Sequence, residues 1–309
     1  MTEENSNYSV YTTDFNTDVN TETSTTGLDN LSERAMLATL ELSSWSGRCI
    51  DDAISEEVVQ NHAAEKDSGR FSKRLINKDH LKNILSICNE ARKVFKDKTL
   101  AWSDRKARLL PSKLFSELSE KLADLKVNHS ETVDLFLEGY NGFVEESRNT
   151  LGGMFKEEDY PTVDELKQKF AFTYGFDPLA DPKDFRCAID EELKKKIQED
   201  IRTRTEEKYK KAMKLLCEKL YAVMAKFNEK LSEKGAKFKN SLVNNIADLV
   251  NILPEMNLTN DPKLAEIAEK IKQDICVFDP EELRHDEQAR EKAVEKSKEV
   301  MDTISNIYG

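Results

Sequence analysis

The sequence lacks the short motifs that mark the common enzyme classes. It has no Walker loop, GxGxxG, HExxH or GxSxG, so the signatures of NTPases, dinucleotide enzymes, zinc peptidases and serine hydrolases are missing. Its four histidines stand far apart, and none has a second metal ligand at a suitable spacing. We therefore predict a protein that is not an enzyme and that has no cofactor and no metal site.

Glycine and proline are also scarce, with ten and seven residues among 309, which is typical of long helices. No run approaches the roughly 20 apolar residues that span a bilayer, and the N-terminus does not resemble a signal peptide. The five cysteines are scattered and form no CxxC pair, as in proteins of a reducing cytosol. The sequence therefore predicts a helical protein of the cytoplasm, with no membrane partner.

Positive charge is outnumbered overall, with 47 Lys and Arg against 59 Asp and Glu, but it is concentrated in one window. The chain has a net charge of -12, yet residues 66–113 hold fourteen Lys and Arg against five acids, a local balance of +9. We call this window the basic island. A positive patch on a repelling background predicts a binding surface for an acidic partner, provided that its residues converge in space.

Three polar-aromatic turns lie in or beside the basic island, at residues 44–48, 68–74 and 102–108, and they contain both tryptophans of the chain. Their basic and aromatic side chains are the candidate partner-binding residues. These are Trp45, Arg48, Arg70, Phe71, Lys73, Arg74, Trp102, Arg105, Lys106 and Arg108.

Three interpretations of these residues remain open from the sequence. In the first, the tryptophans fill a small helical core and the basic side chains pair with acids of the same chain. In the second, the face docks an acidic protein, since Trp and Arg are typical of interface hot spots. In the third, the cations neutralise phosphates of a nucleic acid while an aromatic ring stacks on a base. The acidic balance of the whole chain weighs against the third.

Carboxylates before the second predicted helix offer one further alternative. Asp52 and Glu56 are four residues apart and, with Asp51, could hold a cation. Adjacent acids at a helix start usually act as capping and dipole partners instead. We expect the capping role.

The first third of the chain divides into an N-terminal tail and a segment of short helices, which we call the base. Residues 1–28 carry acids and no Lys or Arg, the composition of a disordered acidic tail. Residues 29–110 predict a base of short helices, at about 30–45, 55–64 and 79–96, with the basic-aromatic turns between them.

Residues 111–235 predict two long helices, because apolar residues recur every three or four positions from Leu114 to Leu151 and from Leu193 to Leu231. Each stripe needs a partner, so we expect an antiparallel helical hairpin, packed in the manner of a coiled coil. The period-two alternation near 170–189 predicts a small β-hairpin at its tip.

Residues 236–309 predict three C-terminal helices, at about 237–253, 262–276 and 280–307. The expected fold class is thus mainly α: an elongated helical bundle with a long antiparallel helical hairpin and a small β-hairpin. The long stripes could also serve a second copy of the chain in a homo-oligomer.

Several short blocks carry a family resemblance. They are 31–38, 45–48, 67–75, 102–111, 151–155, 160–161 and 257–262. Together they resemble an uncharacterised family of helical proteins from bacteriophages and other mobile elements, over about residues 30–285. Members are often encoded near a MoxR-like AAA+ ATPase and a von Willebrand factor A protein. The resemblance implies an adaptor for such an ATPase system and transfers no site residues.

The function predicted from the sequence is that of a non-catalytic interaction or adaptor protein of phage origin in the host bacterial cytoplasm. It would dock an acidic protein partner through the basic-aromatic residues. The alternatives are a nucleic-acid-binding accessory protein that uses the basic island, and an enzyme whose site is assembled from residues far apart in the sequence.

Overall fold

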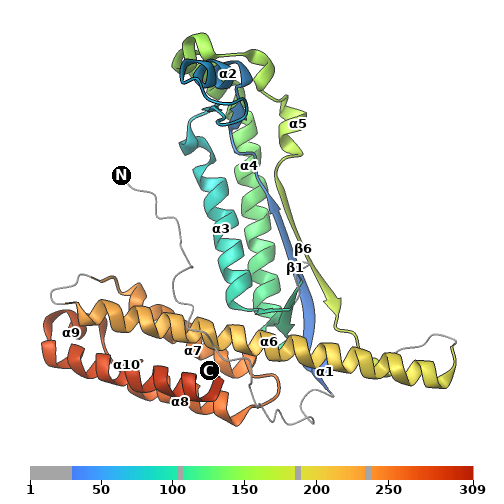
Figure 1. Ribbon diagram of the computed structural model, residues 1–309, viewed down its shortest axis with the longest axis vertical. Coiled ribbons are helices and arrows are strands. Elements are labelled where there is room, and N and C mark those ends of the chain that lie inside the picture. The colour runs from blue at the N-terminus through green and yellow to red at the C-terminus, as the bar shows by residue number, and fades with distance from the viewer. Residues whose placement is uncertain (1–29, 103–106, 185–188, 234–237, 309) are drawn as a thin grey trace. The chain divides into compact units, whose positions relative to one another are not determined.

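The computed structural model describes residues 30–102, 107–184, 189–233 and 238–308 (Figure 1). The chain forms two compact units. Unit 1 contains residues 1–38, 97–115 and 176–309, and unit 2 contains residues 39–96 and 116–175. Both units are discontinuous in sequence, so neither corresponds to one of the four consecutive segments that the sequence suggested. The described part of the chain is mainly α-helical, with two small antiparallel sheets.

Unit 2 is built around two helices, α3 (Lys82–Asp97) and α4 (Phe115–Leu151). The expected apolar stripe of α4 is confirmed, because Leu118, Leu122, Val133 and Phe136 along it are buried. Trp45 packs on this stripe, with its ring 5.9 Å from that of Tyr140 in an edge-on arrangement. Leu75, Ile84 and Cys88 complete the same core.

One end of unit 2 carries the shorter elements. They are β2 (Arg48–Ile50), α2 (Asp52–Asn61), β3 (Ser72–Arg74), the 3-10 turns η2 (Lys78–Leu81), η4 (Gly152–Met154) and η5 (Glu157–Asp159), and α5 (Val163–Lys167). Strands β2 and β3 pair as a separate two-stranded antiparallel sheet, here called the ribbon. Gly47, just before β2, has a φ of +63°, a backbone conformation that favours glycine.

A four-stranded sheet has the order β4-β5-β1-β6, with β4 at Leu100–Ala101, β5 at Arg108–Pro111, β1 at Ala35–Ser43 and β6 at Ala171–Pro178. The register places Ala35 opposite Pro111 and Ala38 opposite Arg108. Strands β1 and β6 each continue from one unit into the other.

Strand β1 corrects the helix expected over residues 30–45, of which only α1 (Leu31–Arg34) is helical. Its Ala, Met and Leu residues favour helix by intrinsic propensity, but that preference is weak and yields to tertiary pairing. Here β5 and β6 flank the segment on both sides.

Strand β6 confirms an extended segment in the region of the expected tip β-hairpin, but its strand partner is β1. The second arm of that hairpin falls mostly on 185–188, outside the described residues.

The other long helix, α6 (Glu191–Ser232), belongs to unit 1, where it packs against α10 (Glu287–Tyr308) and α7 (Ser241–Met256). Helices α8 (Pro262–Asp274) and α9 (Pro280–His285) begin at the expected Asp-Pro steps. The long helices are confirmed. Their pairing as an antiparallel hairpin is not, because α4 and α6 lie in different units.

Among the residues described, no helix combines the length and the apolar character needed to cross a bilayer.

Candidate interaction site

The structure divides the ten predicted partner-binding residues between the two units. Unit 2 holds six of them: Trp45, Arg48, Arg70, Phe71, Lys73 and Arg74. Unit 1 holds Trp102 and Arg108, while Arg105 and Lys106 lie outside the described residues. The basic island is therefore not one surface within a single unit.

Trp45, Trp102 and Arg108 serve the interior or contacts within the chain. Trp45 and Trp102 are buried, and Lys208 lies 5.9 Å from the Trp102 ring centre. The Arg108 guanidinium donates to the Thr99 hydroxyl at 2.6 Å and to the Thr99 carbonyl at 2.8 Å, and burial lowers its pKa. These contacts match the internal alternative.

The ribbon places three further candidates, Arg48, Lys73 and Arg74, on two opposite faces, while Arg70 and Phe71 directly precede β3. Its register sets Arg48 opposite Arg74, Cys49 opposite Lys73 and Ile50 opposite Ser72. Successive side chains of a strand point to opposite faces. Cys49 and Lys73 accordingly share the covered face, whereas the other four side chains are exposed.

The Lys73 ammonium is buried between two carboxylates. It lies 2.8 Å from Asp51 Oδ2 and 2.6 Å from Asp159 Oδ2, and it donates to the Met154 carbonyl at 2.9 Å. The side chains of Lys73 and Asp51 are only 2% exposed. The ammonium therefore has two hydrogen-bond acceptors within the fold, Asp51 and the Met154 carbonyl, and an ion pair with Asp159.

The carboxylates determine the protonation of this cluster. Burial alone would lower the pKa of Lys73, but the hydrogen bonds to Asp159 and Asp51 and the charges of both carboxylates outweigh it and raise the pKa. The hydrogen bond from Lys73 holds the pKa of Asp51 below its usual value. Lys73 stays cationic and Asp51 anionic at neutral pH.

Cys49 adjoins the same cluster as a thiol. Burial raises its pKa, and the nearby Asp159 raises it further. A thiol reacts as a nucleophile only when it ionises, so these surroundings suppress its reactivity.

The cluster ties the ribbon to the chain that follows α4. Asp159 and the Met154 carbonyl belong to that segment, and Lys156 lies 3.6 Å from Asp51 Oδ1. The Tyr160 hydroxyl donates to the Leu75 carbonyl at 2.7 Å, just beyond β3. Several contacts therefore fix the covered face of the ribbon.

The exposed face carries Arg48 and Arg74 side by side. Within the described residues, neither guanidinium has a hydrogen-bond or ion-pair partner, and the same holds for Arg70. Like charges directly opposite each other destabilise an antiparallel pair. An anion placed between them would relieve that repulsion.

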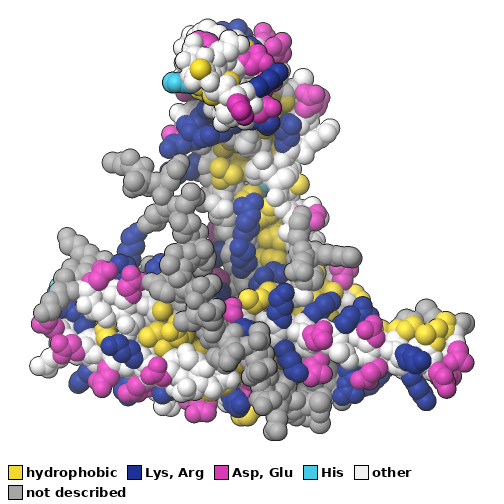
Figure 2. All heavy atoms as spheres, viewed as in Figure 1, with side chains coloured by type: hydrophobic (Ala, Val, Ile, Leu, Met, Phe, Trp, Pro, Cys, Tyr) yellow, Lys and Arg dark blue, Asp and Glu magenta, His cyan; other side chains and the backbone are white. Residues whose placement is uncertain are grey.

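Acids are mixed with these cations in the surrounding chain. Residues 48–74 hold five Lys and Arg and six Asp and Glu. Figure 2 shows both kinds of side chain at the end of unit 2 where α2 lies. The site is a local pair of arginines in a nearly neutral setting, and it is not an extended positive stripe.

Of the acids at the start of α2, Asp51 takes the capping role that we expected. Asp51 accepts from the Ile54 backbone N–H at 3.3 Å and also pairs with Lys73. Asp52 and Glu56 are exposed. In the part of the chain that is described, no group of three or more His, Cys, Asp or Glu is placed to hold a metal ion.

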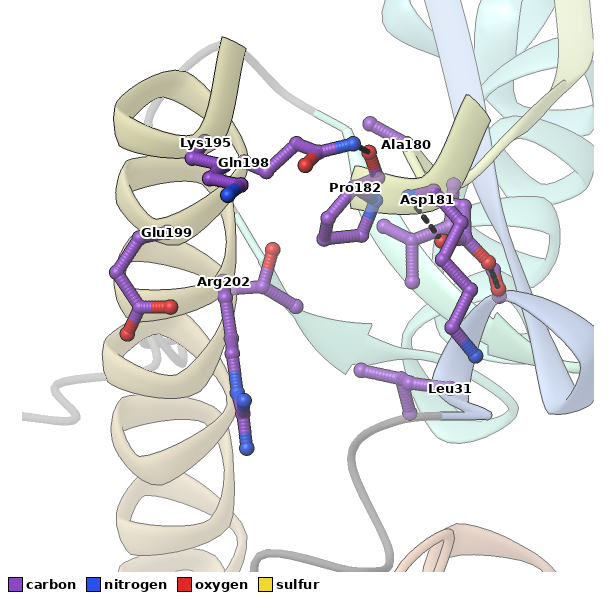
Figure 3. Close-up of a pocket in the computed structure, with 12 residues that line it drawn as sticks. Leu31, Ala180, Asp181, Pro182, Lys195, Gln198, Glu199 and Arg202 are labelled. Carbon is purple, nitrogen blue, oxygen red and sulfur yellow. Dashed lines mark hydrogen bonds between the residues drawn. The ribbon is translucent and has the colours of Figure 1, made fainter. Parts of the chain in front are cut away.

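Unit 1 contains a separate cavity of about 350 Å³ beside α6 (Figure 3). Gln198 extends from α6 and donates to the Pro182 carbonyl at 2.9 Å. Asp181 accepts from the Ser32 hydroxyl at 2.7 Å and from the Lys183 backbone N–H at 2.8 Å. Lys195, Glu199 and Arg202 also line the cavity. Its charges are mixed in sign, so it favours no single class of ligand.

Sequence reasoning missed the acids that neutralise Lys73. Asp159 lies 86 positions further along the chain, and no local pattern links the two. The strands of the ribbon have three residues each, too few for period-two alternation to be recognised.

Comparisons of the chain with models of known protein families, with curated proteins and with solved structures found no match.

Proposed function

We propose that this chain is a non-catalytic interaction protein that docks an acidic protein partner through the exposed face of the ribbon. The observation that carries the proposal is the opposed pair Arg48 and Arg74, exposed and without an acidic partner among the described residues. Arginine forks bind carboxylates through two parallel hydrogen bonds, which makes such a pair well suited to acidic side chains. Arg70, just before β3, adds a third cation nearby in sequence.

The reactive groups beneath this face support a non-catalytic role. Lys73 is held as a cation by two carboxylates, and the Cys49 thiol has a raised pKa. Neither is prepared to act as a nucleophile at neutral pH. The cluster instead holds the covered face of the ribbon in place through its ion pairs and hydrogen bonds.

The mixed charges of residues 48–74 favour a protein over a nucleic acid. A nucleic acid presents closely spaced phosphates, and binding it requires several neighbouring cations. The segment contains more acids than bases, and the basic side chains near Trp102 belong to the other unit. A protein partner can instead present one or two carboxylates at the arginine pair.

The experiment compares binding of polyglutamate and of single-stranded and duplex DNA to the full chain. We expect binding of polyglutamate at low salt and a loss of about tenfold or more in the double variant Arg48→Gln, Arg74→Gln. The matched control is Arg92→Gln, Lys93→Gln, which removes the same charge from exposed positions of α3 in the same unit. Equal losses in both variants would overturn the proposal, and tight DNA binding with a steep salt dependence would replace it with the nucleic-acid alternative.

The family resemblance adds a candidate source for the acidic surface, an AAA+ ATPase system of the MoxR type in the host cytoplasm. Purification of the tagged chain from infected cells, followed by mass spectrometry, tests this. An ATPase recovered with the wild-type chain and lost with the double variant is the expected result. Recovery with both chains would exclude the ribbon as its docking face.

A further inference from the structure

We propose that the outer edge of β3 accepts an extended acidic segment of the partner as an added strand. This inference rests on the proposed function and specifies the form of the partner's docking segment. It follows from the directions of the backbone groups in the ribbon, which can be derived from its hydrogen bonds.

The Leu75 N–H donates to the Gly47 carbonyl at 2.8 Å, and the Asp51 N–H donates to the Phe71 carbonyl at 3.0 Å. In an antiparallel ladder, hydrogen-bonded pairs alternate with non-hydrogen-bonded pairs. The pairs Arg48–Arg74 and Ile50–Ser72 are therefore of the second kind. Their N–H and C=O groups point away from the ribbon, toward its two outer edges.

The two edges differ. On β2, the Ser46 hydroxyl accepts from the Arg48 N–H at 3.3 Å and lies 3.5 Å from the Arg48 carbonyl oxygen, so the outward groups of Arg48 already have a partner in the chain. On β3, no hydrogen bond from another described residue reaches the outward groups of Ser72 or Arg74. Both residues are also exposed. The β3 edge thus presents two N–H and two C=O groups for pairing.

The side chains at this edge specify the chemistry of the occupant. A strand added to β3 places alternate residues on the face that carries Arg74 and, across the ribbon, Arg48. Carboxylates at those alternate positions would meet the guanidinium groups. A second copy of the same edge would instead add its own Arg74 to this positively charged face, and this repulsion opposes pairing between copies.

The cluster beneath the ribbon prepares β3 for such pairing. Lys73, the middle residue of β3, is held by Asp51, Asp159 and the Met154 carbonyl. A strand that is already ordered loses little conformational freedom when a partner binds. Backbone hydrogen bonds then contribute affinity, while the alternate acidic side chains provide specificity.

The test uses a synthetic peptide of alternating glutamate and valine and the full chain, with binding measured by fluorescence anisotropy. The decisive variant is Ser72→Pro, which removes the outward N–H of Ser72 but no hydrogen bond of the β2–β3 ladder. Its matched control is Ser72→Ala, which keeps that N–H. We expect Ser72→Pro to weaken binding by about fivefold or more and Ser72→Ala to change it by less than about twofold.

A second measurement needs no change in the protein, so it remains informative if Ser72→Pro fails to fold. N-methylation of alternate residues removes the N–H donors from one edge of the peptide. Two such peptides can be made, one for each set of alternate residues. We expect one of the two to bind the wild-type chain about fivefold or more weakly than the unmethylated peptide. Amide hydrogen exchange at Ser72 and Arg74 should slow only with the unmethylated peptide.

The outcomes separate this inference from the proposed function. If both methylated peptides bind as tightly as the parent while Arg48→Gln, Arg74→Gln loses binding, docking occurs without strand pairing and the inference is wrong. If the arginine variant also binds normally, the proposed function itself fails.

Discussion

Arg48 and Arg74 face each other across the ribbon as a non-hydrogen-bonded pair, the arrangement that brings opposing side chains closest. Without an anion between them, the two guanidinium groups repel each other. We expect Arg74→Gln to raise the free energy of unfolding by up to about 1 kcal/mol, measured by urea denaturation at low salt. The gain should shrink as salt is added.

The control for this prediction is Arg70→Gln, which removes an exposed positive charge outside the pair. Its effect should stay within about 0.5 kcal/mol. A loss of stability in Arg74→Gln would mean that the guanidinium contributes favourable packing that outweighs the repulsion.

Lys73→Met should be strongly destabilising, because it leaves the carboxylates of Asp51 and Asp159 near each other without the shared cation. Removing one partner from a buried ion pair costs about 3 kcal/mol or more. Urea denaturation of the variant measures the loss. The comparison variant Lys66→Met changes an exposed lysine that precedes β3 in the same unit, and it should be nearly neutral. Similar small effects in both would show that the cluster contributes little to stability.

His129 makes the stability of the fold depend on pH. Its side chain is buried on the α4 stripe beside Phe172, no described residue offers its Nε2 a hydrogen bond, and burial lowers its pKa. The unfolded chain, with a histidine pKa of about 6.5, therefore binds a proton more readily than the folded chain. This contribution to stability is complete above about pH 6.5 and is lost as the pH falls toward the lower folded pKa.

The variant His129→Leu tests this dependence. We expect urea midpoints measured from pH 7.5 to pH 5 to fall less in the variant than in the wild type, because leucine has no proton to gain. At pH 7.5 the variant should be at least as stable, since an unsatisfied buried nitrogen is removed. An unchanged pH profile would show that His129 is not the titrating group.

Tyr308 should stabilise unit 1 through a charge-assisted hydrogen bond. Its buried hydroxyl donates to Asp261 Oδ2 at 2.8 Å, at the N-terminus of α8. We expect Tyr308→Phe to lower the free energy of unfolding by about 2 kcal/mol. Tyr209→Phe is the matched comparison, because the Tyr209 hydroxyl lies 3.2 Å from the neutral Thr259 hydroxyl, and the expected loss is about 1 kcal/mol. A larger loss in Tyr209→Phe would contradict this ranking.

Local signals in the sequence predicted most of the helices, although the single helix expected over 280–307 is divided into α9 and α10. The Asp261-Pro262 and Asp279-Pro280 steps gave the starts of α8 and α9, and the apolar stripe gave α4. Strand β1 was mistaken for helix because its partners, β5 and β6, lie about 70 and 135 residues further along the chain. No local pattern encodes that pairing.

The candidate site shows the same division between local and distant information. Arg48, Arg70 and Arg74 were selected from composition, and all three are exposed. Lys73 has the same sequence signature as its neighbours, yet the two-residue period of a strand turns it toward Asp51 and Asp159. Only the register of the ribbon distinguishes the buried cation from the exposed ones.

Along the sequence, both segments of unit 2 lie between segments of unit 1, and this order has a consequence for synthesis on the ribosome. Every residue of unit 2 has been made once translation reaches Gly175, whereas unit 1 also needs α6 to α10, which come last. Domains generally fold as units during translation. Unit 2 can thus fold first, whereas residues 30–38 and 107–115 of unit 1 can complete their packing only after the C-terminal helices have been synthesised.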